Sequence, residues 1–193
     1  AKVVGILVGE TETGELLEGS QGSIVLDQTP FYAEAGGQVG DTGRLISADA
    51  ATTVADTYSP VQGLIIHKVT VTKGSLKVGD EVTATVDTQK RDATRRNHTA
   101  THLVHAALRE VLGTHVKQAG SVVAPNYLRF DFTHYQPMSA VEIAEVEDLV
   151  NRHILENHSV NTNVMDIEAA MAGGAMALFG EKYGSAVRVL SVG

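Results

Sequence analysis

The hydrophobic and polar positions of the chain change their period at about residue 89. Before that point, short apolar runs alternate with Gly and Asp turn signals at short, even spacing, as in KVVGILVG, QGSIVLDQT and LIIHKVTVT. This pattern is typical of a small antiparallel barrel or sandwich, and it contains no helical period. We therefore predict a β-barrel domain over residues 1–88.

From residue 89 the apolar residues recur at helical spacing. The stretch up to Gly113 predicts a long helix, which this glycine ends, and two strands follow it in HVKQAGSVVA and YLRFDFTH, with a turn at Pro125-Asn126. Ser139, with Glu142 three residues later, predicts a capping box at the start of a second helix. The apolar positions of that helix are Val141, Ile143, Val146, Leu149, Val150 and Ile154.

The last third of the chain returns to strands. SVNTNVMDI and AVRVLSVG are strand-like, and EAAMAGGAMALF between them predicts a short helix broken at Gly173-Gly174. The predicted fold class is therefore α+β, with the barrel followed by an antiparallel sheet that has helices packed on one face over residues 89–193. The sequence begins inside a strand at Ala1 and ends after one at Gly193, so we expect a piece of a longer protein.

Composition narrows the class of protein. The 193 residues carry 15 Lys or Arg against 23 Asp or Glu, a net charge of −8, and they contain no cysteine. No apolar run approaches the ~20 residues that cross a membrane, and no signal peptide pattern opens the sequence. A chain without cysteine has no disulfides, which fits a cytoplasmic protein. We predict a cytoplasmic location, no membrane association and no protein partner.

Positive charge is concentrated in one segment. Residues 90–129 contain seven Lys or Arg against two Asp or Glu, whereas residues 1–89 contain five against twelve. A local basic surface of this kind can bind phosphates on an acidic chain, and a solvated helix start gives the same pattern.

Three histidines share one face of the predicted long helix. His98 and His102 are four residues apart, and His105 follows three residues later. A helix offers two nitrogen ligands to zinc in this way, but zinc needs three or four protein ligands, and structural or surface histidines have the same spacing. Thr99 stands where a metalloprotease helix has its glutamate, so the sequence excludes that class of enzyme.

The other histidines provide no second pair. His115 and His134 are expected to be separate histidines on strands, either packed or at the surface. His153 and His158 are five residues apart and do not share a helix face well. The long helix therefore carries the one candidate pair of metal ligands.

Two further stretches offer polar groups to a ligand. Gly36-Gly37 permits positive φ and a close approach, with the donor and acceptor groups of Gln38 beside it, and a plain hairpin turn explains the same residues. Gln118 shares a strand face with Val116, where it is either a hydrogen-bonded core amide or a ligand contact.

These motifs occur together and in a definite order. The stretches LDQTPFYAEAGGQVGDTG, RRNHTATHLVHAALREVLGTHVKQAGSVV and GAMALFGEKYG resemble the editing region of the bacterial alanyl-tRNA synthetase family, and the resemblance covers essentially all 193 residues. It implies a barrel followed by an α+β editing core, which this family shares with threonyl-tRNA synthetases and free-standing AlaX-type deacylases. The threonyl enzyme lacks the barrel with FYAEAGGQ, and a sequence without an initiator methionine favours a piece of the synthetase over a complete AlaX-type protein.

The resemblance implies a zinc site. His98 and His102 match the His-x-x-x-His motif of the family, whose Cys-x-x-x-His motif follows the strand matched here by AVRVLSVG. The sequence stops at Gly193, before that motif, so the predicted editing core is truncated at its C-terminus. We expect zinc in the parent protein, and absent or weakly bound zinc in this chain, because two ligands hold zinc much less tightly than four.

The resemblance also implies roles for other residues. Thr101 and Gln118 match editing-pocket residues and are the predicted catalytic residues. Gly36, Gly37 and Gln38 match a loop that faces the same cleft and are predicted to bind substrate.

The reaction implied is hydrolysis of the ester between the 3′ end of tRNA(Ala) and a wrong amino acid, Ser or Gly. Arg95 and Arg96 would contact tRNA phosphates. The parent would ligate alanine to tRNA(Ala) with ATP in a domain absent here. The alternatives are a non-catalytic tRNA-binding module, a free-standing AlaX-type deacylase, and a metal hydrolase unrelated to tRNA, for which the sequence lacks a complete ligand set.

Overall fold

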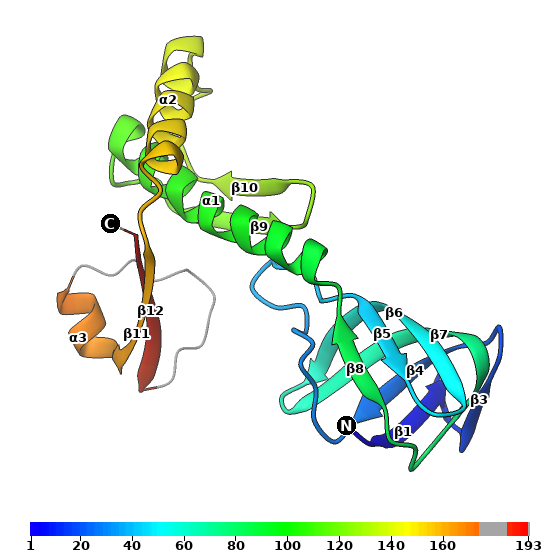
Figure 1. Cartoon of the computed structure of the whole chain (residues 1–193). Helices are drawn as coiled ribbons and strands as arrows, with labels where there is room; N and C mark the ends of the chain where they lie inside the picture. Colours follow the sequence, from blue (N-terminus) through cyan, green and yellow to red (C-terminus); the bar gives the residue numbers. More distant parts are fainter. Residues whose placement is uncertain (174–184, 193) are drawn as a thin grey trace. The chain divides into compact units, whose positions relative to one another are not determined.

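The computed structural model describes residues 1–173 and 185–192, which form two compact units (Figure 1). The first unit comprises Ala1–Asn97 with Val122–Tyr127, and the second comprises His98–Ser121 with Leu128–Gly193. One helix contributes residues to both units. The domain limits predicted from the sequence, 1–88 and 89–193, stay a prediction.

The first unit is built on an antiparallel sheet. Neighbouring strands follow the order β2-β1-β4-β7-β6-β5-β8, and β3 pairs with β7. The strands are β1 (Val3–Val8), β2 (Thr11–Glu12), β3 (Glu15–Leu17), β4 (Gln21–Leu26), β5 (Gly43–Ile46), β6 (Ala50–Val61), β7 (Leu64–Lys77) and β8 (Thr83–Val86). Together with the helices described below, this sheet confirms the predicted α+β class.

The sheet does not close into the predicted barrel by a ladder of paired strands. Its path ends at β2 and β8, and the start of β1 meets the segment before β8 through single hydrogen bonds. Val3 N donates to the Asp80 carbonyl at 2.9 Å, and Val82 N donates to the Ala1 carbonyl at 2.8 Å. One isolated bridge between Lys2 and Glu81 is too short to form a ladder.

Alternation along the strands builds the core of this unit. Side chains one residue apart on a strand point to opposite faces, so every second residue of the long β6–β7 hairpin is available for burial. Val54, Val69 and Val71 are each at most 3% exposed. The buried residues of this core are Val3, Ile6, Leu16, Ile24, Leu26, Phe31, Leu45, Ala50, Val54, Val69, Val71, Leu76 and Val82.

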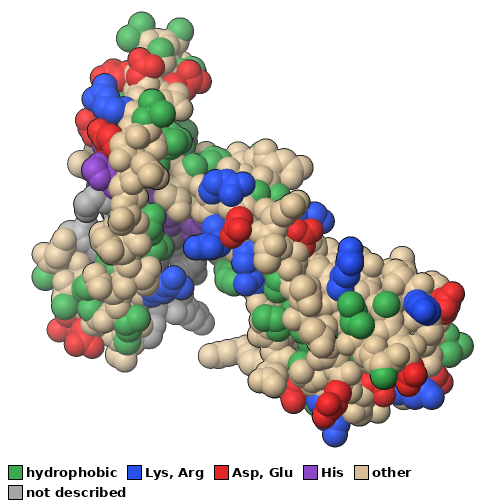
Figure 2. Space-filling model, in the orientation of Figure 1, with side chains coloured by type: hydrophobic (Ala, Val, Ile, Leu, Met, Phe, Trp, Pro, Cys, Tyr) green, Lys and Arg blue, Asp and Glu red, His purple; other side chains and the backbone are tan. Residues whose placement is uncertain are grey.

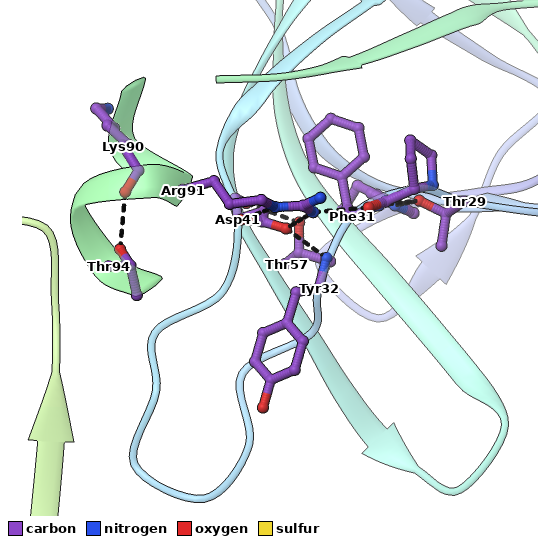
Figure 3. A network of polar contacts seen from close by, with 10 residues as sticks. Thr29, Phe31, Tyr32, Asp41, Thr57, Lys90, Arg91 and Thr94 are labelled. Carbon is purple, nitrogen blue, oxygen red and sulfur yellow. Dashed lines mark hydrogen bonds and ion pairs between the residues drawn. The ribbon is translucent and has the colours of Figure 1, made fainter. Parts of the chain in front are cut away.

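A buried ion pair attaches the loop before β5 to the first long helix, α1 (Thr88–Leu112) (Figure 3). The Asp41 carboxylate, with a side chain 8% exposed, accepts hydrogen bonds from the Arg91 guanidinium and from the Tyr32 N–H. Arg91 also donates to the Pro30 carbonyl at 2.7 Å, and Thr57 Oγ1 donates to the Asp41 carbonyl at 2.9 Å. The start of α1 is therefore fixed to the loop of residues 30–41.

A second buried polar contact lies inside the sheet. The His67 side chain is fully buried, its Nδ1 lies 3.0 Å from the Ile24 carbonyl, and its Nε2 lies 2.8 Å from Thr29 Oγ1. A carbonyl only accepts, so Nδ1 carries the proton and Nε2 accepts from the threonine hydroxyl. Burial lowers the pKa of His67, although the hydrogen bond to Ile24 opposes this effect.

Helix α1 begins and ends near the predicted residues. At its start, Lys90 N donates to Asp87 Oδ1 at 3.1 Å. At its end, Gly113 has φ of 112°, a conformation that residues with a Cβ rarely adopt. Arg109 donates to the carbonyls of Thr114 and Val116 at 3.0 and 3.1 Å, which fixes the connection to the next strand.

The second unit packs two helices and a hairpin around a smaller core. Strands β9 (Gln118–Val123) and β10 (Leu128–Phe132) follow α1, and the predicted turn between them is confirmed by the Ala124 N to Tyr127 O bond. The helix α2 (Ala140–Glu156) has the predicted capping box of Ser139 and Glu142. The buried residues of this core are Ala107, Leu108, Val116 and Val146.

The structure adds two details that the sequence analysis did not specify for this unit. The apolar face of α2 is only partly covered, because Val141, Ile143 and Ile154 are 75%, 44% and 50% exposed while Val146 is buried. The strands that the structure describes in this unit form two pairs, β9 with β10 and β11 (Val160–Asp166) with β12 (Ala186–Val192).

The remaining helix is α3 (Ile167–Ala172), which ends at Gly173. Gly174, where the sequence predicts that this helix is broken, and the motif GAMALFGEKYG lie outside the described residues. In the described part of the chain, no helix is long and apolar enough to cross a membrane.

We predict that Arg91→Met lowers the free energy of unfolding by about 2 kcal/mol, because the Asp41 carboxylate then stays buried without its cation. This value lies below the range of about 3–5 kcal/mol for a fully buried pair, since a third of the Arg91 side chain is exposed. Denaturant unfolding measures it. Arg95→Met is the matched control on the same helix, because Arg95 pairs with Asp92 at the surface and its loss costs less than about 1 kcal/mol. Equal losses in both variants would contradict the prediction.

We predict that acid destabilises the first unit through His67. Its pKa is lowered on folding from an ordinary value of 6.5, so below about pH 6.5 the unfolded chain binds a proton that the folded chain does not. The free energy of unfolding therefore falls as the pH falls below 6.5, and His67 contributes no pH dependence above it. Denaturant unfolding at several pH values checks this. His67→Asn should be less stable at neutral pH and should lose less stability on acidification; an unchanged loss would refute the role of His67.

Candidate functional site

The candidate metal ligands lie on α1 in the second unit. Helical spacing places His98 and His102 one turn apart, and the structure brings their rings together with centroids 5.1 Å apart and planes at 21°. The two imidazoles are thus held side by side on one face of the helix.

Burial favours the neutral form of two of the three helix histidines. Desolvation lowers the pKa of His102, and the neighbouring His98 and His105 lower it further. Desolvation and the Arg109 charge lower the pKa of His105, whose hydrogen bond to the Val116 backbone opposes them. A neutral imidazole has a lone pair, which is the form that coordinates a metal.

The pair fits a zinc ion in part. The Nε2 atoms of His102 and His105 are buried and have no hydrogen-bond partner among the described residues, so no donor competes for the His102 lone pair. Zinc takes three or four protein ligands. The described residues contain no group of three or more His, Asp or Glu side chains placed to hold a metal. His98 and His102 therefore match zinc in donor type and spacing, as two of the three or four ligands that a zinc site needs.

The two predicted catalytic residues lie on different elements. Thr101, adjacent to His102 on α1, is 7% exposed. Gln118 is the first residue of β9 and is half-buried, two residues after the fully buried Val116. Thr101 is thus on a covered side of the helix, and its hydroxyl is removed from bulk water.

The Gly36-Gly37-Gln38 segment is a tight turn in the first unit. Ala35 and Gln38 exchange two backbone hydrogen bonds of 3.2 and 2.9 Å around two glycines with φ of 58° and 82°. Positive φ at both central residues is the requirement of a type I′ turn. The turn is attached to the end of β9, because Val123 N donates to the Gly37 carbonyl at 2.8 Å and Val39 N donates to the Val123 carbonyl at 3.0 Å.

The two predicted phosphate-binding residues are exposed on α1. Arg95 pairs with Asp92 at 3.3 Å, with both side chains more than half exposed. Lys and Arg side chains gather in the middle of the view in Figure 2, with Asp or Glu side chains beside them. Arg91, which belongs to the same basic segment, is instead used in the buried pair with Asp41.

The expectation that His115 and His134 are separate was wrong. His115 Nε2 and His134 Nδ1 are hydrogen-bonded at 2.9 Å, and the Tyr135 ring lies over His115. The predicted turn at Pro125-Asn126 could have indicated this contact. A hairpin closed by that turn pairs Lys117 with Thr133, which brings His115 and His134 together.

Asn97 was also missed. Its side-chain amide donates to the Ala124 carbonyl at 2.7 Å and to the Pro125 carbonyl at 3.3 Å, which ties α1 to the turn after β9 within the first unit. No spacing rule indicates such a contact, since it joins residues 27 and 28 positions apart.

Residues 1–90 match the family described as tRNA synthetases class II (A). The alanine–tRNA ligase of Myxococcus xanthus is 52% identical over 183 residues, 94% of this chain and 20% of the ligase. Those of Solibacter usitatus and Acidovorax sp. are 54% and 53% identical over the whole chain and 22% of each ligase. The chain spans about a fifth of the length of the curated relatives it matches.

We predict that Gly37→Ala destabilises the first unit by about 1–2 kcal/mol, because a Cβ is strained at its φ of 82°. Gly14→Ala is the matched control, since Gly14 has no positive φ and open space where its Cβ would stand. Denaturant unfolding of both variants measures the difference. A Gly37→Ala protein as stable as Gly14→Ala would show that the turn adopts another conformation.

Proposed function

We propose that this chain is the editing segment of an alanine–tRNA ligase and takes part in hydrolysing Ser-tRNA(Ala) and Gly-tRNA(Ala). The observation that carries the proposal is the identity of 52–54% to alanine–tRNA ligases over nearly the whole chain. The parent protein would join alanine to tRNA(Ala) with ATP elsewhere in its sequence and would work in the cytoplasm, where protein synthesis takes place.

The chemistry of amino-acid selection explains why such a segment is needed. A pocket shaped for alanine cannot strongly exclude the smaller glycine, and it excludes serine poorly, because a difference of about one methylene is worth only ~1–3 kcal/mol. A second site that hydrolyses the wrong ester restores accuracy.

In this proposal, α1 carries most of the chemistry. His98 and His102 would hold the zinc ion, for which the neutral, unpartnered Nε2 of His102 is suited. A bound zinc ion supplies polarisation of an ester carbonyl or of a water molecule. The hydroxyl of Thr101 would contact the serine hydroxyl in a covered environment. The side-chain amide of Gln118 would hold the substrate or the attacking water.

Other residues would position the tRNA. The Gly36-Gly37-Gln38 turn has no side chain at its tip, which would allow the aminoacylated 3′ end to approach the backbone closely. The exposed Arg95 and Arg96 would contact phosphates, which fixes the position of the RNA without reading its sequence.

A non-catalytic tRNA-binding module is the second candidate. The observation that favours it is the ligand set, because the described residues offer zinc two imidazoles and no group of three ligands. In that case the basic surface of α1 would bind tRNA and the ester would survive. A free-standing AlaX-type deacylase receives less support, since the relatives compared above are ligases about five times as long as the matched region.

The catalytic roles are tested in the full-length ligase that carries this segment. We expect Thr101→Ala and Gln118→Ala to slow deacylation of Ser-tRNA(Ala) about tenfold or more, because each removes a hydrogen bond to the reacting ester or amino acid. Thr101→Ala should also lower the discrimination between Ser-tRNA(Ala) and Ala-tRNA(Ala). Deacylation rates from purified charged tRNA measure both.

The exposed Thr114→Ala is the matched control and should deacylate at the normal rate. Alanylation of tRNA(Ala) by every variant should remain normal, which reports on folding. Unchanged rates and unchanged discrimination in both Thr101→Ala and Gln118→Ala would remove these residues from the mechanism. Binding of tRNA(Ala) without hydrolysis by the unaltered ligase would favour the non-catalytic module.

The metal is tested by zinc content. We expect substoichiometric zinc in this chain and one zinc per site in the full-length ligase, because two imidazoles hold zinc far more weakly than four ligands. His98→Ala and His102→Ala in the full-length ligase should each lose this zinc, whereas His153→Ala, on α2, should retain it. Tight zinc in this chain alone, measured by mass spectrometry, would mean that other residues complete the ligand set.

A further inference from the structure

A cluster of three rings stands at the end of the β9–β10 hairpin, separate from the histidine face of α1. His115 and His134 are joined by a hydrogen bond of 2.9 Å, with ring centroids 5.1 Å apart and planes at 22°. A centroid separation this large for such a short N···N distance means that the two imidazoles meet edge to edge and nearly in one plane. The Tyr135 ring lies over His115, with centroids 4.5 Å apart and planes at 23°.

The outer face of Tyr135 is open. Its side chain is 86% exposed, more than any other large hydrophobic side chain in the described residues. The ring is held in orientation from below by His115, and His115 is held in turn by the hydrogen bond to His134. A flat aromatic surface fixed in this way loses little conformational entropy when a second ring stacks on it.

We propose that Tyr135 is a stacking platform for an unpaired base of RNA, with His115 as the residue that positions it. The inference rests on the proposed function, because it takes RNA as the partner. Stacking on an aromatic side chain is sequence-tolerant, since every base has a π face, and it suits single-stranded segments, whose bases are not already stacked.

The surrounding charge supports a nucleic acid as the occupant. The exposed Lys117 is paired through its backbone with Thr133, which precedes His134, so a cation stands at the same end of the hairpin. The Glu142 carboxylate at the start of α2 accepts hydrogen bonds from the Ser139 N–H and hydroxyl, which hold it in the capping box. The platform thus offers a ring and a cation, the two groups that single-stranded RNA sites combine.

The probe is a single-stranded hexa-adenylate RNA, compared with an abasic ribose-phosphate chain of the same length. Both carry the same phosphates, so only base stacking separates them. We expect this chain to bind hexa-adenylate more tightly than the abasic chain at equal salt. Tyr135→Ala should weaken hexa-adenylate binding about tenfold and leave abasic binding unchanged. Fluorescence anisotropy of the labelled RNA measures both affinities.

Four further variants isolate the stack. Tyr135→Phe keeps the ring and should retain hexa-adenylate affinity within about twofold. Tyr127→Ala removes another exposed tyrosine, 56% exposed at the turn of the hairpin, and should have no effect. His115→Ala removes the support beneath Tyr135 and should weaken binding less than Tyr135→Ala does. His115→Phe keeps a ring beneath Tyr135 but loses the hydrogen bond to His134, so it should weaken binding less than His115→Ala.

Two results would overturn the platform. One is equal binding of hexa-adenylate and the abasic chain, and the other is a Tyr135→Ala protein with normal folding by circular dichroism and normal hexa-adenylate affinity. Either result leaves the proposed function to its own test, because deacylation of Ser-tRNA(Ala) by the full-length ligase does not depend on this measurement. If Thr101→Ala and Gln118→Ala proved to deacylate at the normal rate, the hexa-adenylate measurement would still report on RNA binding at Tyr135.

Discussion

A buried carboxylate that needs a cation organises the first unit. Asp41 is almost completely covered, and an ionised carboxylate is costly to bury unless charges and hydrogen-bond donors surround it. The Arg91 guanidinium and the Tyr32 N–H both donate to this carboxylate. Arg91 belongs to α1 and Tyr32 to the loop of residues 30–41, so the ion pair joins these two segments. The loop that carries the glycine turn and the first turns of α1 are therefore fixed by one ion pair, to which Asn97 adds a second attachment at the turn after β9.

Local rules predicted the regular elements because those rules act within a few residues. The end of α1 at Gly113 and the capping box of Ser139 with Glu142 depend on backbone geometry within a few residues, which the local sequence predicts. Long-range contacts were beyond such rules. Nothing in the residues around Arg91 separates it from Arg95, yet one is buried against a carboxylate from another segment and the other remains in solvent.

The candidate site shows the same division. The spacing of His98 and His102 predicts a shared helix face, and the structure brings their rings together. The pairing of His115 with His134 depends on the register of a hairpin, which the sequence defines only after its turn is located. Helical periodicity shows which residues of α2 share a face, and it does not show how much of that face a small core can cover, so Val146 is buried while Val141 is exposed.

The twin glycines of the type I′ turn restrict how this loop can change by mutation. A single base change in a glycine codon yields Ala, Val, Asp, Glu, Arg, Ser, Cys or Trp, or a stop codon. Of these, Asp alone enters the left-handed region with some ease, and only half of the glycine codons lead to it. Asn, the other residue that tolerates this conformation, requires two base changes. Nearly every amino acid that a single base change can place at Gly36 or Gly37 therefore strains the backbone of this turn.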